Sequence, residues 1–281
     1  MAGEDDNSQS EKEPSGQLSD DEMGSVAEKK AESARVVHEA IRLQGQDELD
    51  RPILSLLLSA FAAGVGISVS VLAETFLKLR LPPTPAFELV SSLGYPVGFV
   101  IVILGNLQLF TEQTVTAVLP VATHPTPRNF GRLARLWALV LAGNMLGTLL
   151  AAVLMAWQVI LSAEQLAAAT DLSARLLEHD FTRTLLLAMP AGFLVGSIAW
   201  IRPSANSGEF WIVTIITYVI AIGSFSHVVA GAVEAWLLWL TGHASLGWAL
   251  GGFILPALIG NIIGGTGLFA LLAHGQVRHE I

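Results

Sequence analysis

Seven histidines occur in the 281-residue chain, and six of them are expected in the N-terminal tail or in loops. His227 instead lies inside a long apolar stretch, at the point where that stretch breaks. An ionisable side chain at membrane depth is costly and usually marks a route for ions, protons or substrates. The alternative interpretation is a neutral core histidine bonded to a backbone carbonyl. The break in the apolar stretch favours a functional imidazole, which exchanges protons near neutral pH.

A second apolar stretch breaks at Thr111, whose hydroxyl we expect to meet His227 near the centre of the protein. The alternative is that this hydroxyl only satisfies its own unwound backbone. Apolar residues precede both polar centres, and in a channel such residues form constrictions that exclude hydrated ions. Plain core packing is the alternative for them. The candidate path residues are Thr111, His227, Leu109, Phe110, Phe225 and Ser226.

Five further residues form a candidate supporting network. Glu112 and Glu234 fall within apolar stretches, where a carboxylate needs a partner, and Arg135 lies at the head of another stretch. This network is either structural or part of the path. Asn144 and Asn261 are expected to bond a carbonyl of a neighbouring helix, with direct substrate contact as the alternative.

The chain carries this construction twice. Phe110 precedes Gly143 by 33 residues, and His227 precedes Gly260 by 33 residues. Each copy ends in a small-xxx-small pair, which lets two helices approach closely. These pairs are Gly143 with Gly147 and Gly260 with Gly264. Paired, interrupted spans in matching halves of a chain indicate a transport site.

Composition identifies an integral membrane protein. Hydrophobic residues make up 52% of the chain, charged residues 14%, and the mean hydropathy is +0.58, whereas a soluble domain carries about 25% charged residues. The acidic residues concentrate in the N-terminal tail, since 14 of the 24 fall in residues 1–51. No basic surface for nucleic acid is evident. The absence of cysteine and the single intramembrane histidine indicate neither a metal site nor a cofactor.

The apolar pattern predicts an all-α membrane protein with six transmembrane helices. The second and fifth are too long for one straight span, and we expect breaks near 105–114 and 223–228. Three spans in each half require the halves to have opposite orientations, which makes an inverted repeat. The predicted spans are 53–77, 88–122, 133–157, 182–201, 209–240 and 247–273.

Four regions are expected along the chain. Residues 1–26 are acidic and polar and should be disordered, and 27–51 should form an amphipathic helix, with docking against the protein favoured over binding to lipid. Residues 52–275 are the transmembrane domain, and 276–281 form a short C-terminal tail. Seven Lys and Arg residues flank the span ends on one side and four on the other. This bias predicts that both termini are cytoplasmic.

Several motifs together resemble the formate/nitrite transporter family over about residues 50–275. They are Leu109-Phe110-Thr111-Glu112, His227 in the broken fifth span, the segment Gly260-Asn261-Ile262-Ile263-Gly264-Gly265, and Phe130-Gly131-Arg132-Leu133-Ala134-Arg135-Leu136-Trp137. The resemblance implies an aquaporin-like protomer in a homopentamer, with one anion path in each protomer. It also implies the cytoplasmic (inner) membrane of a bacterium.

By the same resemblance, Thr111 and His227 form the selectivity site between two apolar constrictions. Arg135 would occupy a position where family members often carry a lysine that draws anions inward. One motif departs from the family pattern, which reads Phe-Glu-His-Ser with an asparagine soon after. This chain reads Phe225-Ser226-His227-Val228. The missing acid indicates a divergent branch of the family, and the sequence does not name its anion.

The sequence therefore predicts a channel or transporter for small monovalent weak-acid anions, proton-linked through His227, and not an enzyme. Its partners are the anion, protons, the lipid bilayer and other copies of the chain. One alternative is a neutral-solute channel of the aquaporin type, which needs paired Asn-Pro-Ala motifs that this chain lacks. A membrane-embedded enzyme would need clustered metal ligands. A non-transporting assembly or sensor protein, with partners bound to the acidic tail, is the third alternative.

Overall fold

The computed structural model describes residues 33–278, and the predicted acidic tail at 1–26 and residues 279–281 lie outside this part. Within residues 33–278 the chain forms helices, turns and loops, without a strand. Residues 34–278 belong to one compact unit. An all-helical chain of this composition satisfies its backbone polar groups within each helix, as a lipid environment requires.

Within residues 33–278, five helical stretches are long and apolar enough to cross a membrane. They are Ile53–Arg80, Phe87–Leu104, Pro127–Ala156, Phe181–Ser204 and Trp248–Val277. Two shorter apolar helices follow one another at Glu209–Ile222 and Val228–Leu240. The all-α membrane fold is thus confirmed, and the predicted fifth span 209–240 corresponds to the two shorter helices.

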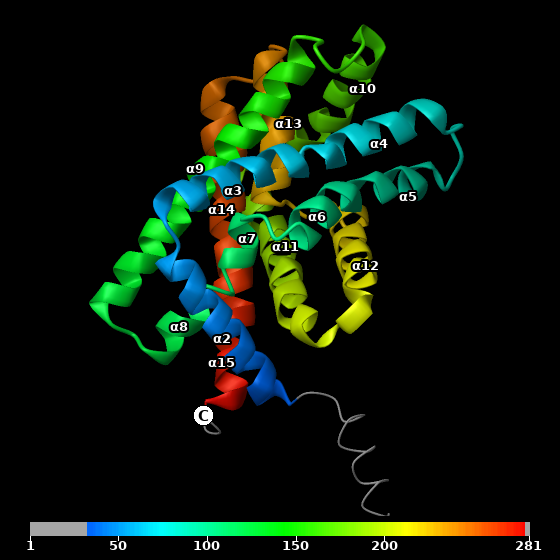
Figure 1. Cartoon of the computed structure of the whole chain (residues 1–281). Helices are drawn as coiled ribbons and strands as arrows, with labels where there is room; N and C mark the ends of the chain where they lie inside the picture. The colour runs from blue at the N-terminus through cyan, green and yellow to red at the C-terminus, as the bar shows by residue number, and fades with distance from the viewer. Residues whose placement is uncertain (1–32, 279–281) are drawn as a thin grey trace, which may run out of the picture. The chain divides into compact units, whose positions relative to one another are not determined.

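The helices are traced in Figure 1 by label and colour from blue to red. The α-helices are α2 (Ala34–Asp50), α3 (Ile53–Ile67), α4 (Val69–Arg80), α5 (Phe87–Ser91), α6 (Tyr95–Leu104), α7 (Phe110–Gln113), α8 (Val118–Thr123), α9 (Pro127–Ala156), α10 (Ala163–Ala174), α11 (Phe181–Ile201), α12 (Glu209–Ile222), α13 (Val228–Leu240), α14 (Leu255–Ile262) and α15 (Leu271–Val277). Short 3₁₀ segments are η1 (Ser92–Gly94), η2 (Arg175–Glu178), η3 (Arg202–Ser204) and η4 (Asn206–Gly208). The last apolar stretch includes two π-helical segments, η5 (Trp248–Ile254) and η6 (Ile263–Ala270).

Both breaks in the apolar stretches have the same local geometry. Asn106 and Ser224 each take a left-handed conformation with φ of 50°. The next residue then donates its N–H back across the helix end, from Leu107 to the carbonyl of Val102 and from Phe225 to that of Ile220, both at 3.0 Å. This hydrogen-bond pattern is the Schellman ending of a helix. α6 and α12 therefore end in the same way, shortly before α7 and α13 begin at Phe110 and Val228.

Small residues allow the long helices to cross closely. A Cβ added to Gly147 of α9 would collide with the carbonyl of Phe61 in α3. In the second half, a Cβ on Gly264 would collide with the carbonyl of Met189 in α11. Neither contact leaves room for a side chain, so α3 and α9, and likewise α11 and η6, approach each other closely.

The amphipathic helix of the prediction corresponds to α2 in the described residues. Its apolar side chains Val37, Ile41 and Leu49 are buried, and the helix packs against α8, α9, α11 and α15. Two histidines differ from expectation, because His38 is buried and His274 lies in α15 rather than in a loop. Docking against the protein buries the apolar face of α2, so this helix with mixed charges does not need lipid to cover that face.

Candidate functional site

Asn144 fixes the first break through three hydrogen bonds. Its Oδ1 accepts the N–H of Phe110 at 2.9 Å. Its Nδ2 donates to the carbonyls of Ala60 and Gln108, both at 2.8 Å. The amide thereby satisfies one orphan donor at the start of α7 and one orphan acceptor of the broken backbone, while it fastens α9 to α3.

Asn261 makes the same set of bonds at the second break. Its Oδ1 accepts the N–H of Val228 at 2.8 Å. Its Nδ2 donates to the carbonyls of Ala188 and Ser226, at 2.8 and 3.0 Å. Both asparagines are fully buried. Unwound backbone within the protein is tolerated when such partners satisfy it, and this role accounts for both amides without a direct substrate contact.

Thr111 and His227 meet where the two breaks converge. Thr111 lies in the first turn of α7, and His227 is the residue that precedes α13. The Oγ1 atom of Thr111 and the Nε2 atom of His227 are 2.8 Å apart. Their exposed fractions are 0% and 2%, so the pair is shielded from solvent.

The tautomer of His227 follows from its second contact. The backbone N–H of Ala230 donates to Nδ1 at 3.1 Å, so this nitrogen caps α13 as an acceptor. A neutral imidazole then carries its proton on Nε2. That proton is donated to Oγ1 of Thr111, which leaves the threonine hydroxyl proton available for another acceptor. Protonation at Nδ1 would require the bond from Ala230 to break.

An aromatic side chain packs against His227, and the apolar residues that precede Thr111 are buried. The Phe99 ring meets the His227 ring edge-on, with ring centroids 5.0 Å apart at 78°. Leu109 and Phe110 are buried, and Phe110 packs against Trp137 at 5.8 Å between centroids. Sequence reasoning missed Phe99, because one phenylalanine in the apolar run of α6 carries no distinguishing signal.

A cavity of about 380 Å³ reaches His227 from one side. Phe225 and Ser226 line it close to the imidazole, and Arg175, Arg183 and Glu234 are among the charged residues of its wall. We call this space the His227 cavity. A second cavity, of about 210 Å³, is lined by Glu112 and Arg202 among others. Leu109, Phe110 and Thr111 line neither of the two.

The predicted charge network is divided into two separate clusters. Glu112 accepts a hydrogen bond from Nη1 of Arg202 at 2.8 Å, and Arg202 also contacts Glu209 at 3.4 Å. Arg135 is placed elsewhere, where its guanidinium donates to the carbonyl of Leu49 at 2.8 Å and so ties α9 to the end of α2. Sequence reasoning missed Arg202, although its position near the end of the fourth predicted span was a signal for it.

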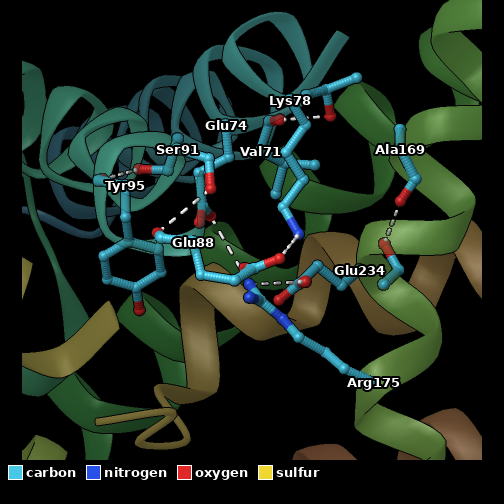
Figure 2. A network of polar contacts seen from close by, with 12 residues as sticks. Val71, Glu74, Lys78, Glu88, Ser91, Tyr95, Ala169, Arg175 and Glu234 are labelled. Carbon is cyan, nitrogen blue, oxygen red and sulfur yellow. Dashed lines mark hydrogen bonds and ion pairs between the residues drawn. The ribbon is translucent and has the colours of Figure 1, made fainter. Parts of the chain in front are cut away.

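The other cluster contains Glu234. Its carboxylate lies 3.5 Å from the guanidinium of Arg175, which also contacts Glu74 at 3.6 Å. Figure 2 shows both carboxylates directed toward Arg175. Sequence reasoning missed Arg175 and Glu74 as partners, because these three residues come from α4, η2 and α13 and only the fold brings them together.

An all-helical membrane fold with two matched helix breaks, and with a buried threonine–histidine pair at the end of a cavity, defines a membrane channel or transporter. The family model described as "Formate/nitrite transporter" matches residues 35–275. The chain belongs to this family.

Two curated bacterial proteins are similar to this chain over most of its length. An Escherichia coli (strain K12) protein named "Inner membrane protein YfdC" is 39% identical over 250 residues, which cover 88% of this chain and 80% of the relative. A Bacillus subtilis (strain 168) protein named "Uncharacterized transporter YrhG" is 26% identical over 243 residues, or 84% of this chain and 90% of the relative.

Solved structures show the same fold. A structure described as "Pentameric formate channel with formate bound" has a TM-score of 0.66 and 18% sequence identity, and the match covers 81% of this chain and 98% of that chain. One described as "FNT family ion channel" also has a TM-score of 0.66, with 17% identity, 86% of this chain and 96% of that chain.

Proposed function

We propose that this protein carries small monovalent weak-acid anions of the formate and nitrite type across a bacterial inner membrane. The observation that carries the proposal is the 2.8 Å contact between Thr111 and His227 at the end of the His227 cavity. Membership of the formate/nitrite transporter family supports it. So do the inner-membrane name of the Escherichia coli relative and the formate bound in the channel that shares the fold.

The proposal includes a protomer of six spans in two inverted halves, with an aquaporin-like arrangement. α12 and α13 together then form the broken fifth span. Support comes from the identical helix endings at Asn106 and Ser224 and the matching bonds of Asn144 and Asn261. Both termini are cytoplasmic in this proposal. The pentameric assembly of the similar formate channel supports five protomers with one path in each.

The proposed path crosses a dry constriction at Leu109, Phe110 and Phe99. A bare anion loses its hydration there, which is costly unless hydrogen bonds replace the lost water. Because Nε2–H of His227 is donated to Thr111, the threonine hydroxyl is free to donate to the anion. The pair therefore offers a donor at the point where hydration ends.

Proton linkage through His227 has two stages, which are sharing of a proton with the anion and then complete transfer of a proton to it. In the first, the anion shares the Nε2 proton and the hydroxyl proton through hydrogen bonds, and no charge moves. Complete transfer requires a second proton, which reaches the ring from solution through the His227 cavity, and the bond from Ala230 to Nδ1 breaks when Nδ1 takes up this proton. The anion then takes the Nε2 proton and crosses as the neutral acid, while the ring keeps the proton on Nδ1. The cap bond to Ala230 therefore has to break in each cycle that moves a proton together with the anion.

The test is flux through the purified full-length protein in liposomes, with formate, nitrite, acetate, lactate and hydrosulfide supplied separately. The proposal predicts saturable uptake of at least one of these anions, accompanied by a pH change inside the vesicle. Glycerol swelling measured on the same vesicles is expected to match that of empty liposomes. Glycerol permeation without anion flux would overturn the proposal in favour of a neutral-solute channel.

A further inference from the structure

Arg175 and Glu234 line the His227 cavity, and Glu74 joins them in a charge cluster through its contact with Arg175. Nη2 of Arg175 lies 3.6 Å from Oε2 of Glu74 and 3.5 Å from Oε1 of Glu234. Both carboxylates are buried, with exposed fractions of 2% and 5%. α4, η2 and α13 supply one residue each, so the cluster depends on the tertiary fold (Figure 2).

The bonding of this cluster is incomplete. Oε1 of Glu234 is buried and lacks a hydrogen-bond partner within the described residues. Arg175, Glu234 and His227 all line the same cavity of about 380 Å³. A buried carboxylate oxygen that makes no hydrogen bond is stabilised only weakly by a cation at this distance, and protonation relieves the cost of its charge. Among the described residues, Oε1 of Glu234 is thus held by its 3.5 Å ion pair with Arg175 alone, and the residue lies in the wall of the His227 cavity.

The charges of the cluster do not balance. One guanidinium faces two carboxylates, so full ionisation leaves a net charge of −1. Burial lowers the pKa of Arg175, but the adjacent carboxylates Glu234 and Glu74 outweigh burial and raise that pKa above its ordinary value. The arginine therefore stays charged. Two carboxylates that share a site resist double ionisation, because the second negative charge is placed close to the first.

Other ionisable groups near Glu234 have partners or lie on the cavity wall. Lys78 is paired with Glu88 at 3.1 Å, at the end of α4. Tyr95 is buried near the cluster (Figure 2). The remaining ionisable groups on the wall or on the adjacent helix α10 are Glu178, His179, Arg183, Glu164 and Asp171. Glu74 and Glu234 are distinguished from all of these by burial against a shared cation.

We propose that the Glu74–Arg175–Glu234 cluster is a proton-controlled entry site for monovalent anions in the His227 cavity, an inference that rests on the proposed function. When both carboxylates are ionised, one negative charge neutralises Arg175 and the other repels an incoming anion. A proton bound by the carboxylate pair makes the cluster neutral and leaves the guanidinium available to the anion. The same proton is then close to the permeant before it reaches His227.

The experiment compares Glu234→Gln with the wild-type protein across a pH series in liposomes, and the measured quantity is the ratio of their anion fluxes. This ratio cancels the titration of the substrate itself, which affects both proteins equally. We expect a ratio near 1 at acid pH that rises to roughly 10 at alkaline pH, since charges lining a cleft change ion entry by about 10-fold or more. Glu74→Gln should behave in the same way.

Glu88→Gln is the matched control, because it removes a carboxylate of the same region whose side chain is 68% exposed and paired with Lys78. Its flux ratio to wild type should not vary with pH. A ratio for Glu234→Gln that is constant across the series would overturn the entry site. If neither Glu234→Gln nor Glu74→Gln assembles, infrared spectra of the wild-type protein test whether the carboxylate pair binds a proton. They should show a protonated carboxyl band that disappears as flux falls, and a band independent of pH would overturn the inference.

The outcomes separate this inference from the proposed function. If the wild-type protein carries none of the anions at any pH, the proposed function fails. If it carries anions and the Glu234→Gln ratio is flat, the proposed function stands and the entry site alone fails.

Discussion

The Nε2 atom of His227 lies 2.8 Å from Oγ1 of Thr111, and the two residues follow the helix breaks at Ser224 and Asn106. The contact needs both helix breaks, because α7 and α13 begin within the protein and direct their first residues toward one another. Nδ1 of His227 is occupied by the N–H of Ala230. One tautomer, and hence one direction of donation between the two side chains, is therefore selected by the backbone.

Thr111→Val should lower anion flux strongly, because it removes the hydroxyl and keeps the volume of the side chain. Thr111→Ser keeps the hydroxyl and should retain most of the flux. The loss of one preorganised donor in a shielded site typically costs about 10²-fold in rate. Initial uptake rates in proteoliposomes measure both variants. Equal rates for Thr111→Val and Thr111→Ser would show that the hydroxyl takes no part.

Asn261→Ala should destabilise the protein, since it leaves the N–H of Val228 and the carbonyls of Ala188 and Ser226 without partners. Each buried, unsatisfied group costs about 1–3 kcal/mol. Thermal unfolding in detergent should show a clear decrease in midpoint.

Asn129→Ala is the control for this substitution. Asn129 also donates to a carbonyl, that of His124, at 2.9 Å, but it lies near the surface. Its substitution should leave the midpoint close to that of the wild type. A decrease as large as that of Asn261→Ala would mean that the buried hydrogen bonds of Asn261 stabilise the protein no more than a bond near the surface.

Gly147→Ala should force α3 and α9 apart, because the new Cβ would collide with the carbonyl of Phe61. Gly264→Ala should do the same to α11 through the carbonyl of Met189. Overpacking of this kind typically costs about 1–3 kcal/mol. Gly131→Ala, where nothing lies within 4 Å of the added Cβ, should be neutral or slightly stabilising. Thermal midpoints that fail to separate Gly131→Ala from the other two would refute the tight crossings.

Docking of α2 should weaken as the pH falls. Burial lowers the pKa of His38. The nearby His274 and Arg42 lower this pKa further, whereas Glu39 raises it. Because the docked state favours the neutral ring, its contribution is complete above the ordinary pKa of about 6.5 and is lost as the pH falls through the lowered value. The ring also contacts Nδ1 of His274 at 3.1 Å.

Hydrogen exchange of the α2 amides, corrected for intrinsic rates, measures this effect. Protection should decline in the acid range for the wild-type protein, and His38→Gln should remove that dependence. Protection that stays constant with pH in the wild type would contradict the prediction.

The sequence was sufficient to predict the two helix breaks, the meeting of Thr111 with His227 and the buried asparagines, because each of these follows from a polar residue in an apolar run. The left-handed conformation of Ser224 was not predicted, because glycine or asparagine usually occupies such a position and serine does not indicate it. The tautomer of His227 depends on the position of one backbone N–H, which a linear pattern does not contain.

The charge partners were the least predictable part of the site. Glu112 and Glu234 were identified as acids in apolar surroundings, but Arg135 was the arginine placed with them in the candidate network. The structure pairs them with Arg202 and Arg175, which are 90 residues after Glu112 and 59 residues before Glu234 in the chain. Both arginines lie at span ends, where sequence analysis assigned them to orientation rather than to the site.

The most direct test of the proposed mechanism is proton-linked anion uptake by His227→Phe in liposomes, with internal pH and anion concentration recorded together. The substituted ring keeps an aromatic side chain against Phe99 but has no nitrogen to bond Thr111 or to cap α13. We predict loss of anion-dependent proton movement, while size-exclusion chromatography shows the oligomer of the wild type. Anion uptake and internal pH changes equal to those of the wild type would contradict the mechanism.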